Sequence, residues 1–203
     1  MAQTDLAFEN SEDDTALIPG TTLCEGQFTL THQIGAGGFG LTYQAEDNIL
    51  GRTVVIKECF PEDFCMRHGI NVVPRNQQHA KQFQSIVAMF MHEARSLAKL
   101  RHPNIVGVHR AFEENNTADR VRDLSEGKDL LDIVEESAET LTPAVVEDLL
   151  IKLLDAVEKV HDMDLLHRDI APDNIMIDKA GTPILIDFGA ARGDASRKTR
   201  MIS

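Results

Sequence analysis

The sequence predicts an α+β fold of two lobes, in which an antiparallel β-sheet with one helix precedes a mainly helical part. Alternating strand patterns over residues 28–34 and 41–45 flank a glycine-rich turn, and an amphipathic helix follows at residues 83–100. Apolar residues then recur at helical spacing between residues 142 and 160, which predicts the second lobe. A chain of 203 residues with 42% hydrophobic content can bury one sizeable core or two small ones that share a cleft.

The composition is acidic, and this restricts the class of partner. A formal net charge of −13 argues against general affinity for nucleic acid or for an anionic membrane surface, because phosphate contacts need clustered Lys and Arg. The three cysteines, Cys24, Cys59 and Cys65, are too few for a disulfide framework and lack the spacing of a zinc site. We therefore expect no nucleic-acid partner, and thiols that are buried or unreactive.

Residues 1–20 are predicted to form a disordered tail, because acidic residues there stand among small and polar ones. The tail lacks the basic start and apolar stretch of a secretory signal. Nowhere does the sequence run to about eighteen apolar residues, the length that a membrane-spanning helix needs. We expect a cytoplasmic chain without a membrane segment.

The glycine-rich turn GAGGFG occupies residues 35–40. A dinucleotide-binding turn requires a helix directly after the glycines, whereas a strand follows here, so a dinucleotide-binding oxidoreductase is a disfavoured alternative. Two strands joined by such a turn form a hairpin flap. Gly35, Gly37 and Gly40 lack Cβ atoms, which lets backbone N–H groups lie close to phosphate oxygens. An ordinary glycine-rich hairpin is the alternative for this motif taken alone.

A lysine and a glutamate follow the flap. Lys57 ends the β-branched run RTVVIK, and after a polar, proline-broken insertion Glu93 is the only acid on the helix predicted at residues 83–100. The apolar stripe of that helix consists of Phe83, Val87, Phe90, Ala94, Leu97 and Ala98. We expect Glu93 to turn inward and pair with Lys57, which leaves the ammonium directed at phosphate. The alternative is a surface glutamate and a lysine that extends to water.

The second lobe begins with a helix for which Thr142 is the predicted N-cap and Pro143 the first residue. Its predicted core residues are Val146, Leu149, Leu150, Leu153, Leu154, Val157 and Val160. The segment HRDIAPDN follows, then a hairpin of IMID, the turn KAGT and PILI, and then Asp187. Asp169 is placed to accept the proton of a hydroxyl, and the oxygens of Asn174 and Asp187 suit Mg²⁺.

Together these motifs resemble the protein kinase family: IGAGGFGLTY, VVIK, Glu93 before HPNIV, HRDIAPDN and DFG occur in its order and approximate spacing. GGFGLTY and IKECFPEDF are most similar to bacterial serine/threonine kinases that read GGFGITY and IKEYFP. The resemblance covers about residues 20–203. It implies a protein-kinase-like fold, with an N-lobe over 21–124 and an incomplete C-lobe over 125–203 that ends within the activation loop.

The resemblance implies that the chain uses ATP and Mg²⁺ to phosphorylate Ser/Thr hydroxyls of a protein. Asp169 is then the catalytic base, Lys57 contacts the phosphates, Glu93 orients Lys57, and Asn174 and Asp187 hold Mg²⁺. The implied nucleotide-binding residues are Ile34, Gly35, Ala36, Gly37, Gly38, Phe39, Gly40, Thr42, Val55, Lys57, Asp123, Ser125 and Met176. His167 and Phe188 belong to an apolar column that joins the lobes.

The sequence departs from the family pattern at Ala171, where serine/threonine kinases usually carry a lysine that contacts the transferred phosphate. Losing that cation should slow transfer, because charge stabilisation supplies much of the catalysis. The bacterial group often has a small residue here, so we interpret Ala171 as a tolerated variation.

A second departure is the segment TADRVRDLSEG at residues 117–127, where the family has an apolar strand leading to the adenine-binding hinge. Arg122 falls at the gatekeeper position behind adenine. A buried arginine needs an acid such as Asp187 or Glu93, and one that captured Glu93 would take it from Lys57. Alternatively, the strand lies at the edge of the lobe and these side chains reach water.

The third departure is that the chain stops within the family's activation loop, where Ser196, Thr199 and Ser203 are candidate phosphorylation sites. The favoured hypothesis is a serine/threonine kinase. The alternative is a pseudokinase or nucleotide-binding regulatory module without turnover, which Arg122, Ala171 and the early end favour.

Overall fold

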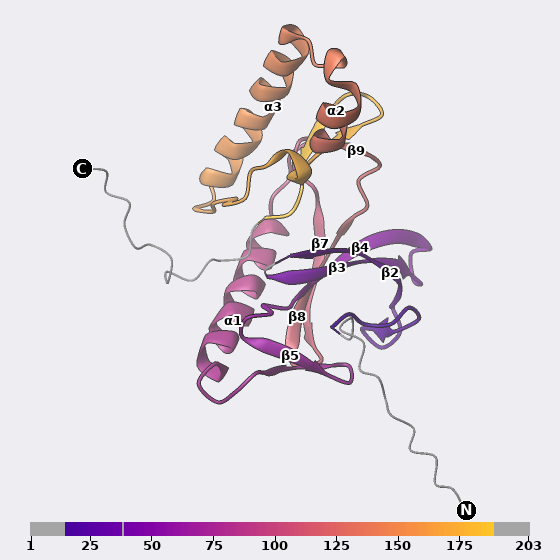
Figure 1. Ribbon diagram of the computed structural model, residues 1–203, viewed down its shortest axis with the longest axis vertical. Coiled ribbons are helices and arrows are strands. Elements are labelled where there is room, and N and C mark those ends of the chain that lie inside the picture. Colours follow the sequence, from indigo (N-terminus) through magenta and orange to yellow (C-terminus); the bar gives the residue numbers. More distant parts are fainter. Residues whose placement is uncertain (1–14, 38, 189–203) are drawn as a thin grey trace, which may run out of the picture.

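Two lobes are visible in the computed structural model, which describes residues 15–37 and 39–188. A six-stranded antiparallel sheet with helix α1 forms one end of the molecule, and α2 and α3 lie at the other (Figure 1). The sheet has the order β1-β2-β3-β4-β8-β7. Its strands are β1 (Thr22–Leu23), β2 (Phe28–Gly37), β3 (Gly40–Asp47), β4 (Arg52–Cys59), β8 (Thr117–Asp123) and β7 (Val108–Glu114). These features confirm the predicted α+β fold class.

The glycine turn joins β2 to β3 as an antiparallel hairpin, as the alternating patterns predict. Strand β4 carries Lys57 and lies between β3 and β8, so it has a partner strand on each side. Apolar side chains of these strands form the main core, among them Leu30, Tyr43, Val54 and Ile56. The segments predicted to bind a nucleotide are therefore held by a well-buried sheet.

Strand β8 does not lie at the sheet edge, so the alternative in which its charged side chains reach water is wrong. It is hydrogen-bonded to β4 on one side and β7 on the other. Asp119 and Arg120 are 2% exposed and Arg122 is 6% exposed. The order of the strands in the sheet causes this burial, and the sequence of β8 alone does not predict it.

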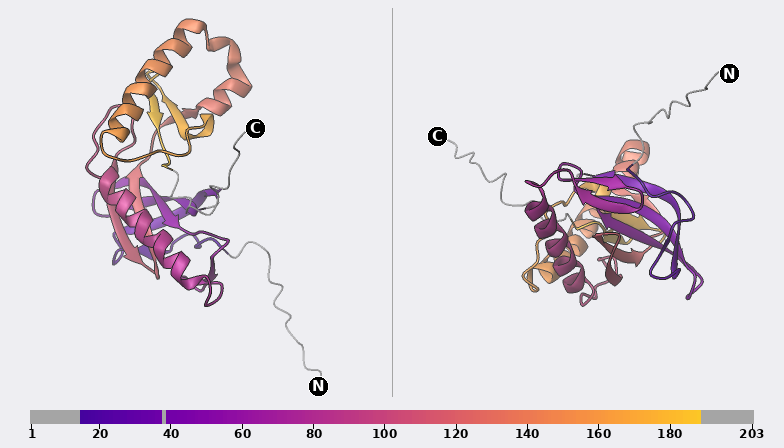
Figure 2. Two further views of the ribbon diagram at one scale, coloured as in Figure 1. Left: turned by 90° about the vertical axis from the view of Figure 1, so that its left-hand side faces the viewer. Right: turned by 90° about the horizontal axis from the view of Figure 1, so that it is seen from below.

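Helix α1 (Ala80–Leu97) packs along one face of the sheet (Figure 2). Its buried residues are Phe83, Ile86, Phe90, Met91, Ala94 and Leu97, which confirms the predicted helix and most of its apolar stripe. The helix ends three residues before the predicted boundary at residue 100. The insertion ahead of it contains a second hairpin, β5 (Cys65–His68) with β6 (Asn71–Pro74).

The second lobe has one long helix and a small sheet. The hairpin of β10 (Ile175–Asp178) and β11 (Pro183–Leu185) is confirmed, and β9 (Gly127–Asp129) pairs with β10. The helices are α2 (Leu130–Ser137) and α3 (Pro143–His161), with single 3₁₀ turns at Ala138–Thr140 and Pro172–Asn174. Thr142 caps α3 by accepting a hydrogen bond from the Val145 N–H at 3.4 Å, as predicted.

The predicted core of α3 is only partly correct. Leu149, Leu153 and Val160 are buried, but Leu150 is 53% exposed and Leu154 is 66% exposed. One face of α3 packs against β11 and its neighbours, while no other described residues cover the opposite face. Periodicity predicted that this helix is broadly apolar, but it did not predict which face would be covered.

The predicted disordered tail over residues 1–20 extends too far. Leu17 is buried in the core of the sheet lobe, and its N–H donates to the Tyr43 hydroxyl at 3.0 Å. Residues 1–14 lie outside the described part of the chain, as do the candidate phosphorylation sites Ser196, Thr199 and Ser203. The boundary between lobes at residues 124 and 125 stays a prediction.

Cys59 and Cys65 are buried, and Cys24 is half-buried. Burial raises the pKa of both buried thiols to about 12. Among the described helices, none has the length and apolar character needed to cross a bilayer.

Candidate functional site

A cavity of about 250 Å³ lies where the two lobes meet. The first lobe contributes the flap, strands β3, β4 and β8 and the chain directly after β8, with the residues Ile34, Gly35, Thr42, Val55, Arg122, Leu124 and Ser125. The second lobe contributes Asp129, Asp173, Asn174, Met176, Ile186 and Asp187. The cavity thus brings together six predicted nucleotide-binding residues and both predicted Mg²⁺ ligands. Sequence analysis missed Leu124, Asp129, Asp173 and Ile186. Leu124, Asp173 and Ile186 are each adjacent in sequence to a predicted site residue, which offered a clue, whereas Asp129 is not.

The other predicted nucleotide-binding residues do not line this cavity. They are Ala36, Gly37, Phe39, Gly40, Lys57 and Asp123, while Gly38 lies outside the described residues. The side chain of Asp123 turns away to His109, with Nε2 and Oδ1 2.5 Å apart. Lys57 is connected to the cavity through Asp187.

Gly40 has a structural requirement of its own. A Cβ atom at this position would lie 2.4 Å from the Glu58 carbonyl oxygen on the neighbouring strand, a distance that side chains do not adopt. Close packing of β3 on β4 therefore requires glycine at residue 40. Gly35 and Gly37 have more room, so the flap glycines do not share one physical reason.

Behind the cavity, ion pairs join β4, β8, α1 and the segment after β11. The Lys57 ammonium lies 3.1 Å from Asp187 Oδ2. Arg120 Nη1 donates to Glu93 Oε1 at 3.0 Å, and its Nη2 lies 3.4 Å from Asp187 Oδ1 and donates to the Phe188 carbonyl oxygen at 3.0 Å. The Arg120 guanidinium also lies over the Phe90 ring, 5.3 Å from its centroid.

The expected pair between Lys57 and Glu93 is wrong among the residues that the structure describes, because Glu93 pairs with Arg120. Arg120 stands directly opposite Lys57 in the register of β4 and β8. From this position the planar guanidinium of Arg120 contacts both Glu93 and Asp187, and the Lys57 ammonium pairs with Asp187 instead. An arginine does capture Glu93, as one alternative anticipated, but it is Arg120 rather than Arg122.

Burial and charge perturb the acids and bases of this cluster. Burial by itself would raise the pKa of Asp187, but the positive charges of Lys57, Arg120 and Arg122 lower it to about 2. Burial lowers the pKa of Lys57 and Asp187 opposes that shift. Burial likewise raises the pKa of Glu93, and Arg120 opposes it. Asp187 is therefore a carboxylate at neutral pH.

Arg122 lines the cavity, which agrees with the gatekeeper position assigned to it. Its Nη1 donates to the Asp123 carbonyl oxygen at 3.3 Å. Its Nε is buried and has no hydrogen-bond partner among the described residues. Arg122 thus lines the cavity with a nearly buried side chain that makes one long hydrogen bond within the described part of the chain.

Hydrogen bonds order the segment that carries Asp169. The side-chain amide of Asn174 donates to the backbone oxygen of Asp169 at 3.0 Å and to its carboxylate Oδ2 at 3.1 Å. His167 Nε2 donates to the Ile186 carbonyl oxygen at 2.9 Å, and the Asp169 N–H donates to His167 Nδ1 at 3.3 Å. Burial lowers the pKa of His167, so the ring is neutral and can serve as donor and acceptor together.

His167 and Phe188 are both buried, and their ring centroids are 4.5 Å apart. This contact connects the Asp169 segment to the Asp187 segment and agrees with the predicted apolar column.

The donor set fits Mg²⁺ in type. Asn174 uses its amide nitrogen for Asp169, which leaves its carbonyl oxygen as a ligand, and Asp187 adds a carboxylate on the same cavity. Both oxygens of Asp187, however, are already paired with cations. A metal ion at this place would compete with Lys57 and Arg120.

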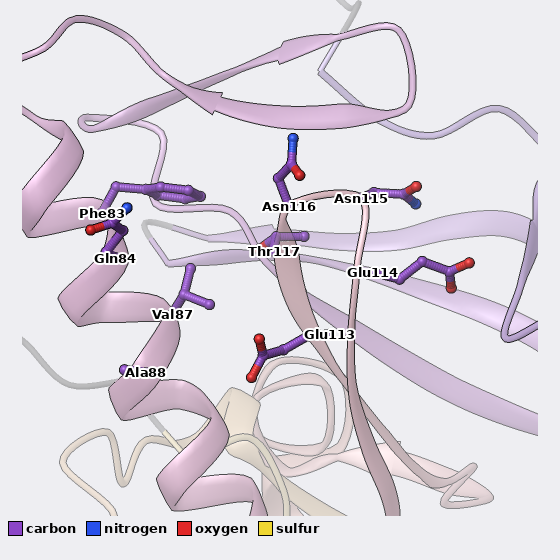
Figure 3. A pocket seen from close by; sticks show the side chains of 9 residues that line it. All are labelled: Phe83, Gln84, Val87, Ala88, Glu113, Glu114, Asn115, Asn116 and Thr117. Carbon is purple, nitrogen blue, oxygen red and sulfur yellow. The ribbon is translucent and has the colours of Figure 1, made fainter.

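A larger cavity of about 530 Å³ lies between α1 and the turn joining β7 to β8 (Figure 3). Phe83 and Val87 of the helix face Glu113 and Asn116 across it. It contains none of the predicted site residues, so the smaller cavity between the lobes is the candidate site.

Comparisons with known proteins agree with this geometry. The model of the protein kinase domain matches residues 28–202. A probable serine/threonine-protein kinase PknB of Bifidobacterium longum is 32% identical over 181 residues, which cover 85% of this chain and 24% of that protein. The serine/threonine-protein kinase PknA of Nostoc sp. is 32% identical over 175 residues, 84% of this chain and 28% of the relative. The chain thus spans about a quarter of the length of these two relatives.

One solved structure, described as PpkA-294 apo form, superposes with a TM-score of 0.79 and 36% sequence identity. The match covers 88% of this chain and 63% of that one. The similarity therefore extends from the motifs to the arrangement of both lobes.

Proposed function

The chain belongs to the protein kinase family, and on this premise we propose that it transfers the γ-phosphoryl group of ATP to Ser/Thr hydroxyls of a protein. The observation that supports this most directly is the hydrogen bond between the Asp169 carboxylate and Asn174, which lines the same cavity as Asp187. The base and both metal-ligand candidates thus lie at one place.

In the proposed reaction, Asp169 accepts the proton of the substrate hydroxyl while the oxygen of that hydroxyl attacks the γ-phosphorus. The bond between the γ-phosphorus and the bridging oxygen breaks, and ADP leaves. Asn174 holds the Asp169 carboxylate at 3.1 Å, which fixes the direction in which the base points. Backbone N–H groups of the flap at Gly35 lie over the phosphates.

Asn174 and Asp187 are the residues that would hold Mg²⁺. When bound, this ion neutralises charge on the phosphate oxygens. Lys57 is held by Asp187 at 3.1 Å rather than by Glu93, so Asp187 positions both the lysine and the metal in this proposal.

Replacing the base tests the reaction. Asp169→Asn should lower the rate of phosphoryl transfer by about 10²–10⁴-fold, because the amide cannot accept the hydroxyl proton. Transfer of radiolabelled phosphate from ATP to a generic protein substrate measures the rate. The exposed Asp162→Asn at the end of α3 is the matched control and should leave the rate unchanged. A variant at residue 169 as fast as the parent would exclude this residue as the base.

The pairing of Glu93 with Arg120 favours a second candidate, a nucleotide-binding module without turnover. In that case the parent binds ATP but transfers no phosphate at a rate above the Asp169→Asn background. Arg120→Met frees Glu93 for Lys57 and separates the two candidates. A gain of transfer would indicate that Arg120 suppresses catalysis in an otherwise competent site, and continued absence of transfer would support the binding module.

A further inference from the structure

Arg120 connects three parts of the molecule behind the cavity. Its Nη1 donates to Glu93 Oε1 of α1 at 3.0 Å. Its Nη2 donates to the Phe188 carbonyl oxygen at 3.0 Å and lies 3.4 Å from Asp187 Oδ1. The guanidinium also lies over the Phe90 ring of α1, and the side chain is 2% exposed, so water screens these contacts little. Strand β8, helix α1 and the segment that carries Asp187 are thus joined through one buried side chain.

Lys57 is held less firmly than Arg120. Among the described residues its ammonium has one ionic partner, Asp187 Oδ2 at 3.1 Å. Its side chain is 14% exposed, against 2% for Arg120. A flexible ammonium with one contact moves to a new anion at a smaller cost than a buried guanidinium that bridges several groups. Lys57 can therefore leave Asp187 for a phosphate without breaking the connection between α1 and the Asp187 segment.

Glu93 belongs to the connection that Arg120 makes. Within the described part of the chain, Arg120 is the one cation that forms an ion pair with it, and the Glu93 side chain is 12% exposed. In the arrangement that the family resemblance implies, Glu93 would instead orient Lys57. The observed pairing gives its carboxylate a different route to Asp187, which runs through the guanidinium of Arg120.

We propose that Arg120 is a positioning residue of this site, which fixes Asp187 and Phe188 relative to α1, and that Glu93 acts through Arg120 rather than through Lys57. Arg120 does not line the cavity, so its effect on a bound nucleotide passes through Asp187. It holds one oxygen of that carboxylate and the backbone directly after it, which restricts how the carboxylate is oriented. The consequence for catalysis rests on the proposed function, whereas the positioning does not.

Amide hydrogen exchange followed by NMR tests the positioning and needs no turnover. The Ile186 N–H, one residue before Asp187, donates to a backbone oxygen at 3.0 Å. Glu93→Gln keeps the shape of the side chain and removes its charge, so we expect the Ile186 N–H to exchange at least threefold faster. The Asp178 N–H of the β10–β11 hairpin is the internal reference and should change by less than twofold.

Two double variants identify the route. In an Arg120→Met background, Glu93→Gln should change the Ile186 exchange rate by less than twofold, because the bridge is already gone. In a Lys57→Met background, Glu93→Gln should still raise that rate at least threefold. A Glu93 effect that persists without Arg120, one that disappears without Lys57, or no effect in the single variant would overturn the proposal. If Arg120→Met fails to fold, the single variant and the Lys57→Met background still decide.

Turnover gives a second readout. Arg120→Met should lower kcat at least tenfold and change the KM for ATP by less than threefold, since Arg120 does not line the cavity. Arg120→Lys keeps the charge but cannot bridge the same groups, so it should restore little of kcat. Arg110→Met, at an exposed arginine of the neighbouring strand β7, is the matched control and should leave both constants unchanged.

The outcomes of the two readouts are distinguishable. A gain of transfer in Arg120→Met, or full activity of Arg120→Lys, would contradict the positioning role. A parent that transfers no phosphate, with the expected exchange pattern, would refute the proposed function and support the positioning by Arg120.

Discussion

The sheet lobe and the helical lobe bury their residues in different ways. The sheet packs β2, β3, β4 and β8 around a continuous apolar core and closes over charged side chains such as Glu58 and Arg120. The helical lobe has small clusters around Leu153 and Val160, and the outer face of α3 exposes Leu150 and Leu154. A strand enclosed by neighbours thus buries even charged residues, whereas a helix that is packed on one face exposes apolar ones on the other.

The sheet lobe should be the more sensitive to loss of a single charge. Arg67 Nη2 lies 2.5 Å from Glu58 Oε2, both side chains are nearly buried, and the Tyr43 hydroxyl also donates to Glu58 at 3.2 Å. Arg67→Met leaves the Glu58 carboxylate without its cation, so we expect a loss of about 3–5 kcal/mol in the free energy of unfolding. Urea unfolding followed by circular dichroism measures it.

The matched control for this change is Lys152→Met, which removes an exposed ion pair with Asp148 on α3 and should cost less than about 0.5 kcal/mol. Equal losses for the two methionine variants would contradict the contrast between the lobes.

Two neighbouring leucines test the one-sided packing of α3. Leu153 packs with Ile175 and Leu185, so Leu153→Ala should cost about 2–4 kcal/mol. Leu154 points away, and Leu154→Ala should cost about 0.5 kcal/mol or less. Both are measured by urea unfolding. A large loss at both positions would mean that the outer face of α3 is covered in solution.

The burial of Asp119 in the sheet should make the free energy of unfolding depend on pH. Burial raises its pKa well above the usual value, with Glu58 and Glu114 adding to the shift. Because the folded state then holds a proton that the unfolded state has lost, stability falls as pH rises from the unfolded pKa of about 3.9 to the folded pKa. The loss is about 1.4 kcal/mol for each pH unit by which the pKa is raised.

Asp119→Asn removes this dependence, because an amide does not titrate. Relative to the parent, the variant should therefore gain stability as pH rises from 4 to 8, as measured by urea unfolding at each pH. A difference between the two proteins that stays constant with pH would show that Asp119 keeps its proton affinity unchanged on folding.

The smallest expected effect is at the start of α3. Thr142→Ala removes the hydrogen bond from the Val145 N–H, which is long at 3.4 Å, so we expect a loss of about 0.5–1 kcal/mol. Thr142→Ser retains the hydroxyl and should recover most of it. Thermal unfolding of the three proteins compares them, and a loss above 2 kcal/mol would indicate that Thr142 does more than cap the helix.

The candidate site was largely predictable where local pattern decides it. The glycine turn between β2 and β3, the run ending at Lys57 and the segment from Asp169 to Asn174 are read from consecutive residues. The partner of Glu93 was not predictable in this way. It depends on the register that places Arg120 opposite Lys57, and hydrogen bonds between strands distant in sequence set that register.

By itself, the sequence determined the α+β class, the β2–β3 and β10–β11 hairpins, helices α1 and α3, the cap at Thr142 and the family motifs. These features follow from the periodicity and turn chemistry of short segments, which depend only on consecutive residues. The tertiary structure alone decided that β8 lies inside the sheet, that Arg120 holds Glu93 and Asp187, and that Leu154 stays exposed while Leu153 is buried. Burial and ion pairing belong to neighbours in space, and those neighbours come from distant parts of the chain.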